Sequence, residues 1–520
     1  MVERRLTDLS KSMTTPRTSI YFYSTAVGIA VIVFISLGYL GLPLWIDELH
    51  TSWTLSGDYG SIHERANAGN QSPLYFYILK FLVNITGHTE STLRIFSVVC
   101  ACCSVAMLNW FCWKYKFRLF ATLLTSLSFA TGHIQLIFAL EARSYSLLTL
   151  LVLILFCISA DRWTTIGTTD KRQKNRSFWR REVLWLIVAA LCFYTHYMAI
   201  PAIVSLMLAH LLIRPTSSTK RLKLVFVQAC ALTAILATQF DTLESIYIHR
   251  SQWGTFIRAQ SATIQALMTK LPIVSLIMLP LVFLLVSRPK LGELKPLFRG
   301  ALMMAVLPYL TAWATTRLDW INWFFPRYLV ICLPAFSLFC GICVHAVDRH
   351  LHSTALTICL TFSSLAIFLT FDSKVIDSYR QGTITVKTEH WNAVVKRLNE
   401  SAEPDDTILL AAGLVEDTRL PELAATLHTE NITTAEYCCF PLFGMYPVTE
   451  QLTIEPVSEY RNSLKLAAKL RTTPKGWLIV RGYSHNKRVK QVLGRLFGED
   501  GFIDHRLPGK VNLYSFQTLE

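Results

Sequence analysis

Charged residues are scarce in this sequence. Asp, Glu, Lys and Arg make up 16% of its 520 residues, against roughly a quarter in an ordinary globular chain. Hydrophobic residues make up 52% and aromatic residues 12%, and the mean hydropathy is +0.38. A disordered chain would be polar and poor in aromatics, and a soluble enzyme would carry more charge. The composition therefore favours a membrane protein.

Several signatures of other protein classes are also missing. The sequence contains neither a G-x-x-x-x-G-K-[ST] loop nor a G-x-G-x-x-G fingerprint, so nucleotide binding has no support. Of the 13 cysteines, only Cys438 and Cys439 lie outside apolar stretches, which excludes a disulfide scaffold. Cys340 and Cys343 form a C-x-x-C without a second pair, inside an apolar stretch. We interpret them as packing residues rather than metal ligands.

Long apolar runs are what the sequence has in abundance. A bilayer core needs about 20 apolar residues per helix, and somewhat fewer where a span is kinked or packed. On that measure we predict eleven spans, at residues 20–42, 92–113, 119–138, 144–160, 183–198, 199–213, 222–238, 270–287, 300–315, 328–346 and 353–371. The first run is longer than the core of a cleavable signal and is expected to remain as a span.

Acidic residues are outnumbered, with 35 Asp and Glu against 50 Lys and Arg and a net charge of +15. The basic residues concentrate in alternate segments between the predicted spans. This is the positive-inside pattern, which predicts a cytoplasmic N-terminus. The basic excess is therefore a signal of topology, and we expect no nucleic-acid partner.

The composition changes after the last predicted span. Residues 372–520 contain no apolar run long enough to cross a membrane. Residues 391–398 and 489–497 have helical patterns, and residues 407–412 and 477–481 look like buried strands. We predict two domains, a transmembrane domain over 1–371 and a small α/β domain over 372–520. With eleven spans the second domain would lie outside the cytoplasm.

Two adjacent carboxylates, Asp47 and Glu48, directly follow the first span, with His50 close behind. The outer loop that they open is nearly fifty residues long, and a connector of that length suggests a site. Two neighbouring carboxylates can supply a general base and an orienting group or metal ligand. The alternative is a pair of solvated loop acids. A short apolar stretch at residues 78–85 is expected to form a juxtamembrane helix in the same loop, with a re-entrant packing element as the alternative.

A second group of polar residues follows the third span. Glu141, Arg143 and Tyr145 lie within five residues of a predicted membrane boundary. Arg offers a planar fork of donors suited to a phosphate, whereas an internal ion pair between Glu141 and Arg143 is the alternative. Ionisable groups at membrane depth are costly, so those that gather at span ends on one face are functional candidates by default.

The predicted outer ends of the fifth and tenth spans also carry candidate residues. His196 lies among aromatic residues at the end of the fifth span, where it is either a packing residue or part of a site. Arg327 and Tyr328 open the tenth span, where Arg327 could bind an anion or anchor the helix by snorkelling. On the predicted topology all these candidates converge on the outer face.

One carboxylate plus arginines at a membrane surface suits a particular reaction. If the donor is a sugar esterified to a long-chain lipid phosphate, the acceptor hydroxyl needs a base, which one carboxylate provides. The departing lipid phosphate needs cationic stabilisation more than protonation. This arrangement fits inverting glycosyl transfer better than glycoside hydrolysis, which normally needs two separated carboxyl groups.

Six short motifs, taken in order, resemble those of polytopic glycosyltransferases of the GT-C class. The resemblance is to its bacterial branch, similar to protein O-mannosyltransferases and the aminoarabinose transferase of lipid A. The motifs are Trp45-Ile46-Asp47-Glu48, Ser72-Pro73-Leu74-Tyr75, Leu93-Arg94-Ile95-Phe96-Ser97, Glu141-Ala142-Arg143-Ser144-Tyr145, Tyr194-Thr195-His196-Tyr197 and Pro326-Arg327-Tyr328. They extend over residues 45–328 and leave the C-terminal domain uncovered.

The resemblance implies a polyprenyl-phosphate-linked sugar as donor, catalysis on the outer face and a bacterial cytoplasmic membrane as location. It implies Asp47 as catalytic base with Glu48 as its neighbour. The phosphate-binding candidates are Arg143 and Arg327, with Tyr145 and Tyr328 beside them, and Glu141, His196 and His50 are accessory candidates. Whether the protein holds a divalent metal stays open. Residues 70–73 offer no carboxylate that could bind one.

Non-enzymatic functions remain as alternatives. A lipid-linked-sugar transporter or flippase would be expected to show inverted repeats and charges near the bilayer midplane, and the sequence shows neither. A membrane assembly subunit, or a family member that binds the lipid without transferring sugar, is the other alternative. The sequence does not specify the sugar or the acceptor.

Overall fold

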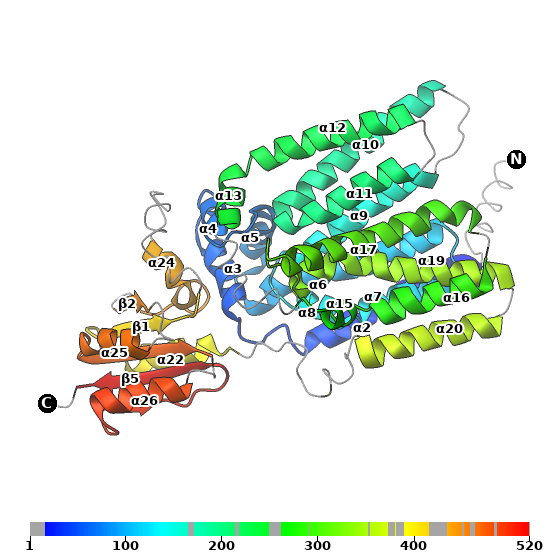
Figure 1. The fold of residues 1–520 in the computed structure, drawn as a ribbon. Helices are drawn as coiled ribbons and strands as arrows, with labels where there is room; N and C mark the ends of the chain where they lie inside the picture. Colours follow the sequence, from blue (N-terminus) through cyan, green and yellow to red (C-terminus); the bar gives the residue numbers. More distant parts are fainter. Residues whose placement is uncertain are drawn as a thin grey trace, which may run out of the picture. The chain divides into compact units, whose positions relative to one another are not determined.

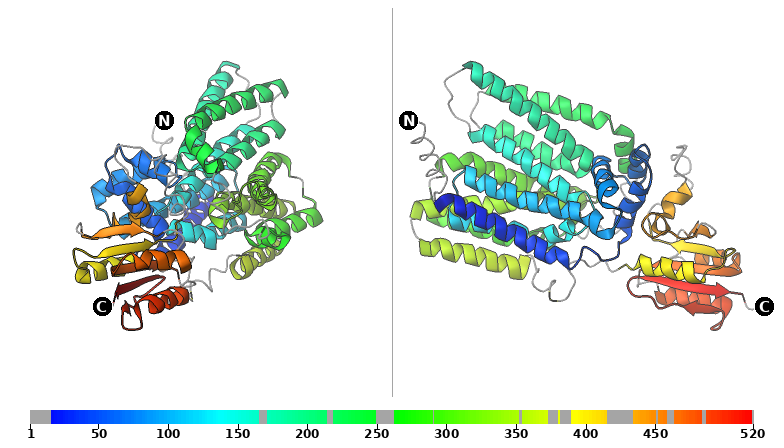
Figure 2. Two further views of the ribbon diagram at one scale, coloured as in Figure 1. Left: turned by 60° about the vertical axis from the view of Figure 1, so that its left-hand side comes forward. Right: turned by 180° about the vertical axis from the view of Figure 1, so that it is seen from behind.

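The structure is a computed structural model, and most of the described chain is helical (Figures 1 and 2). The chain divides into two compact units, which are described separately. The first comprises Met1–Tyr39 and Arg94–Ile384, and the second comprises Leu40–Leu93 and Thr385–Glu520. The described residues are 16–164, 171–213, 218–248, 262–289, 291–351, 354–372, 380, 389–414, 434–449, 452–457, 463–482 and 486–518.

The first unit is a bundle of helices that run side by side (Figure 1). The helices at its centre are apolar on all sides, as expected for buried helices. Residues 329–348 are buried, and α19, which contains most of them, packs against α7 and α17. The helices are α2 (Pro16–Leu37), α6 (Glu90–Lys114), α7 (Leu119–Ala130), α8 (His133–Ala139), α9 (Tyr145–Thr164), α10 (Lys171–Thr195), α11 (Ile200–Leu212), α12 (Ser218–Ala237), α13 (Phe240–Ile248), α15 (Ile264–Thr269), α16 (Leu279–Ser287), α17 (Lys295–Arg317), α18 (Pro326–Leu329), α19 (Leu333–Leu351) and α20 (Thr354–Ile367).

Helices in the bundle are joined by small polar residues and close packing. Ser128 on α7 donates a hydrogen bond to Ser337 on α19, with 3.0 Å between the two Oγ atoms. Asn109 on α6 bonds Ser126 on α7, also at 3.0 Å. Because lipid offers no hydrophobic driving force between helices, close packing and interhelical hydrogen bonds of this kind hold such bundles together.

The predicted count of eleven spans is not confirmed. Five helical segments are long and apolar enough to cross a membrane, and the count rises to seven if two bent helix pairs each form one span. Helices α7 and α8 are bent by 55° at Gly132, and α12 and α13 by 78°. Three further apolar helices, Leu74–Thr86, Tyr197–Leu212 and Thr357–Thr370, are shorter. Hydropathy locates apolar runs, but bends and breaks decide how much of each run is one helix.

The second unit combines the long loop after α2 with the C-terminal part of the chain. The loop forms three helices, α3 (Ile46–Ser56), α4 (Ile62–Ala68) and α5 (Leu74–Thr86). The predicted short helix near residues 78–85 is confirmed as part of α5. The C-terminal part contains α22 (Trp391–Ser401), β1 (Thr407–Ala411), α24 (Thr434–Cys438), β2 (Thr453–Pro456), α25 (Ser463–Arg471), β3 (Lys475–Arg481), α26 (Asn486–Phe497), β4 (Phe502–Asp504) and β5 (Val511–Gln517).

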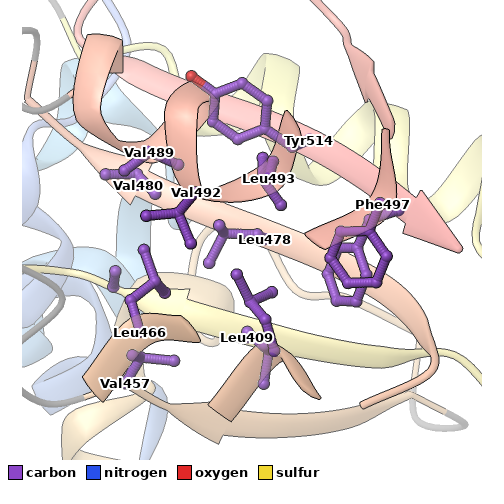
Figure 3. Packing of buried hydrophobic residues seen from close by; sticks show 13 residues of the cluster. Leu409, Val457, Leu466, Leu478, Val480, Val489, Val492, Leu493, Phe497 and Tyr514 are labelled. Carbon is purple, nitrogen blue, oxygen red and sulfur yellow. The ribbon is translucent and has the colours of Figure 1, made fainter. Parts of the chain in front are cut away.

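The C-terminal part has a five-stranded sheet in the order β2-β1-β3-β5-β4. Strands β2, β1 and β3 are parallel, whereas β5 runs antiparallel to both β3 and β4. Figure 3 shows Leu409, Leu478 and Val480 from the strands packed against side chains of α25 and α26, such as Leu466 and Val489. The two strands and two helices predicted here are confirmed. The other strands were missed because β2 and β4 are short and β5 is only partly buried.

The predicted domain boundary after residue 371 stays a prediction. The structure adds that residues 40–93 group with the C-terminal part rather than with the helical bundle. All thirteen cysteines are free, as the absence of a disulfide framework in the sequence predicted.

Candidate functional site

Asp47 lies in the first turn of α3, in the second unit. Trp45 precedes the helix in an extended conformation, with φ −89° and ψ 171°. The Glu48 Oε2 atom accepts a hydrogen bond from the Trp45 backbone N at 3.3 Å, and Glu48 is only 1% exposed. Asp47 is half-buried. The positive end of the helix dipole favours the ionised form of a carboxylate at this position.

Glu48 and Asp47 therefore occupy different environments in spite of being adjacent. Glu48 satisfies a backbone donor that helix geometry leaves without an intrahelical partner. That contact gives Glu48 a capping function, and its catalytic assignment stays a prediction. Asp47 is the more accessible of the two carboxylates and is the stronger candidate for a base.

His50 lies one turn after Asp47, inside a cluster of aromatic rings. Its Nδ1 atom is 3.2 Å from Gln71 Nε2, and the side chain is 4% exposed. The ring centroids of four aromatic residues lie 5.2–6.3 Å from that of His50, namely Trp53, Phe76, Tyr437 and Phe440. These contacts make His50 a packing residue of α3, and its accessory role in a site stays a prediction.

The bend between α8 and α9 holds Glu141 and Arg143 in the first unit. Both side chains are buried, at 4% and 7% exposed. Ser97 on α6 donates to the carbonyl oxygen of Arg143 at 3.3 Å, which fixes the backbone of the bend. The guanidinium carbon of Arg143 lies 5.8 Å from the centre of the Tyr145 ring. Burial of an arginine charge costs free energy unless a protein group or a ligand interacts with it.

Arg327 and His196 complete this cluster. The His196 ring lies between two tyrosines, with its centroid 5.4 Å from that of Tyr145 and 6.1 Å from that of Tyr328. Tyr145 is also the ring beside Arg143, so contacts with the two tyrosines place His196 in one group with both arginines. The guanidinium carbon of Arg327 is 5.6 Å from the Tyr328 ring centre. Five of the predicted residues therefore meet in one place.

The Nδ1 atom of His196 accepts a hydrogen bond from the backbone N of Met198 at 3.1 Å. In the neutral imidazole this leaves the proton on Nε2, where it can be donated. Two arginines, an imidazole and two phenols form a set of hydrogen-bond donors, and the charged members of the set are positive. Such a set is suited to a phosphate group.

Among the residues that the structure describes, no group of three or more His, Cys, Asp or Glu side chains is arranged to hold a metal ion. Lys270 was not among the predicted residues; it donates to the Phe324 carbonyl and lies 4.4 Å from the Phe324 ring centre. Glu389, which accepts a hydrogen bond from the backbone N of Ile46 at the start of α3, was not predicted either. No local sequence pattern indicates either residue, because the partners of both are far away in the sequence.

No known family profile matches the sequence, and no curated protein matches it either. Solved structures do match. The chain is similar to the apo structure of ArnT from Cupriavidus metallidurans, with 10% identity, a TM-score of 0.53 and coverage of 96% of this chain and 98% of that one. The same protein bound to undecaprenyl phosphate matches with 10% identity and a TM-score of 0.52, covering 94% and 97%.

A third similar structure is an oligosaccharyltransferase from Archaeoglobus fulgidus in complex with Zn and sulfate. It has 10% identity, a TM-score of 0.48 and coverage of 96% of this chain and 73% of that one. The two ArnT matches extend over nearly the full length of both chains, so they include the C-terminal part that the sequence motifs left uncovered. The resemblance inferred from the six motifs is confirmed at the level of fold: this chain has the fold of ArnT.

Proposed function

We propose that this protein transfers a sugar from a polyprenyl-phosphate-linked donor to a hydroxyl acceptor, with inversion, at the outer face of a bacterial cytoplasmic membrane. The observation that carries the proposal is the group formed by Arg143, His196 and Arg327, which Tyr145 and Tyr328 link by ring contacts, in a chain with the fold of ArnT. An ArnT structure holds undecaprenyl phosphate, the kind of lipid that such a cluster of donors suits.

The proposed reaction assigns one role to each group. Asp47 takes the proton from the acceptor hydroxyl as its oxygen bonds to the anomeric carbon of the sugar. The bond between that carbon and the phosphate oxygen breaks, and the electron pair leaves with the polyprenyl phosphate. Arg143 and Arg327 stabilise the charge on the departing phosphate, with Tyr145, Tyr328 and His196 as further donors. Attack opposite the leaving group inverts the anomeric centre.

The proposed topology places the N-terminus in the cytoplasm and the C-terminal domain, residues 372–520, outside it. The positive-inside distribution of Lys and Arg supports this orientation. The acceptor stays open among lipids, glycans and proteins.

The test is turnover by the purified protein in liposomes that contain polyprenyl-phosphate-linked sugars. We expect the wild type to consume the donor and release polyprenyl phosphate, with an acceptor gaining the sugar mass. Asp47→Asn should abolish transfer while expression and lipid binding persist. Asp58→Asn is the matched control, since Asp58 is an exposed carboxylate of the same loop whose Oδ1 atom accepts a hydrogen bond from the backbone N of Ser61 at 2.8 Å, and the Asn side-chain oxygen can accept the same bond.

Two outcomes would contradict the proposal. Full activity of Asp47→Asn would remove Asp47 as the base. Movement of the lipid-linked sugar across the bilayer without modification of any acceptor would instead favour a transporter or flippase.

A further inference from the structure

The carboxylate of Glu389 is bonded on both oxygens. Its Oε2 atom accepts the backbone N–H of Ile46 at 3.0 Å and the Trp391 indole N–H at 2.9 Å. Its Oε1 atom accepts from Arg481 Nε at 2.8 Å. Glu389 is 5% exposed, so these bonds are shielded from solvent. A charge buried this deeply is retained only with such partners.

The position of the Ile46 amide gives this contact its significance. Ile46 is the first residue of α3, and Asp47 is the next. The first N–H groups of a helix have no intrahelical acceptor, so an outside group must satisfy them. Glu48 bonds the N–H of Trp45, and Glu389, 343 residues further along the chain, bonds that of Ile46. The backbone immediately before Asp47 is therefore held by two carboxylates.

The C-terminal sheet positions Arg481, the charged partner of Glu389. Arg481 is the last residue of β3, at the carboxyl end of the parallel strands β1 and β3. In open α/β sheets this edge usually receives a ligand. Here the same edge carries Arg481, which orients Glu389 toward α3. Helix α3 also contacts the Phe440–Leu442 turn of the same domain.

We propose that Glu389, oriented by Arg481, is a positioning residue that sets the orientation of Asp47 for proton transfer. The C-terminal domain then completes the catalytic apparatus through the backbone of α3, without itself touching the sugar donor. The inference deepens the proposed function and rests on it, because it assumes that Asp47 is the base. A displacement of about 1 Å at a reacting group can cost on the order of 100-fold in rate.

Three variants separate positioning from simple loss of a contact. Glu389→Leu removes both acceptors. Glu389→Gln keeps one acceptor for Ile46 but turns an amide N–H toward the Arg481 Nε–H, so two donors oppose each other. The Gln Oε1 atom occupies the place of the Arg Nε atom along the side chain. The double variant Glu389→Gln with Arg481→Gln therefore restores a donor and acceptor pair.

The experiment measures kcat, the donor KM and thermal unfolding of the full-length protein in liposomes. We expect kcat to fall about 30- to 100-fold in Glu389→Leu and about 10-fold in Glu389→Gln, with the donor KM within about twofold of wild type. The double variant should recover to within about threefold of wild type. Lys490→Met is the control, since its ion pair with Asp504, at 2.6 Å, lies within the C-terminal domain.

An unchanged kcat in Glu389→Leu would overturn the proposal, as would a double variant no more active than Glu389→Gln. If the wild type shows no transfer, the proposed function fails instead. Hydrogen exchange of the peptide that contains Ile46 then decides the positioning by itself. Faster exchange in Glu389→Leu than in Lys490→Met supports it, and equal exchange overturns it.

Discussion

Arg65 and Glu436 form an ion pair with 2.9 Å between Nη2 and Oε1, although 371 residues separate them in the sequence. The indole of Trp53 donates to the same Glu436 oxygen at 2.9 Å, and the Arg65 guanidinium carbon lies 4.7 Å from the Trp53 ring centre. One carboxylate therefore joins helices α3, α4 and α24. This contact, with that of Glu389, explains why residues 40–93 group with the C-terminal part.

Removal of the Arg65 side chain should destabilise the second unit. Arg65→Met leaves the partly buried Glu436 carboxylate without its charged partner, and we expect a loss of about 1–3 kcal/mol in the free energy of unfolding. Chemical denaturation in detergent, monitored by Trp fluorescence, measures it. Lys396→Met is the control, because its pair with Glu400 is exposed and 3.8 Å long, and such a pair contributes about 0–1 kcal/mol. Equal losses in the two variants would contradict the prediction.

Donor lipid retention should depend on the two arginines of the first unit. We expect Arg143→Ala and Arg327→Ala each to weaken binding of a polyprenyl phosphate about tenfold or more, because each removes charge-assisted hydrogen bonds to the phosphate. Native mass spectrometry of the detergent-purified protein measures the bound fraction. Arg317→Ala is the control, since Arg317 is an exposed arginine in the last turn of α17. Unchanged lipid occupancy in the double variant would remove both residues from the donor site.

Stability should depend on pH through His88. Burial lowers the pKa of His88 below its ordinary value of 6.5, Lys80 acts in the same direction, and Glu90 opposes them. Its Nε2 atom is 3.0 Å from Ser52 Oγ on α3. Because the unfolded state binds the proton more readily, the stabilisation is complete above about pH 6.5 and is lost as the pH falls below that value.

The comparison for His88 is between wild type and His88→Gln, melted at pH 7.5 and at pH 5.5. We expect the wild type to lose more stability on acidification than His88→Gln, which has no titrating ring. The same loss in both proteins would show that His88 does not contribute to the pH dependence.

Gly300 on α17 lies directly against the Trp163 side chain of α9. A Cβ atom at this position would lie 2.0 Å from Cζ3 of Trp163, so α17 could not keep its present distance from α9. We expect Gly300→Ala to cost about 1–3 kcal/mol, the usual range for overpacking. Gly38→Ala is the control, because a Cβ there would meet nothing within 4 Å. Thermal unfolding in detergent measures both variants, and equal melting temperatures would contradict the assigned packing.

The local patterns of the sequence were sufficient for the helical character of the chain and for the principal strands and helices of the C-terminal domain. Apolar runs mark buried helices because their side chains avoid water regardless of their partners. The same holds for the buried strands β1 and β3, which the sequence placed to within two residues. The six ordered motifs also identified the fold, which the ArnT structures confirm.

Tertiary structure alone decided the rest. The number of uninterrupted spans depends on the bends at α7–α8 and α12–α13, which hydropathy does not register. The distinction between Asp47 and Glu48 depends on which carboxylate caps α3, and the grouping of Arg143 and Arg327 about His196 depends on how helices pack. Glu389 has no local signature at all, because its partner is 343 residues away. Composition and periodicity report on nearest neighbours along the chain, whereas a site is made by residues that only folding brings together.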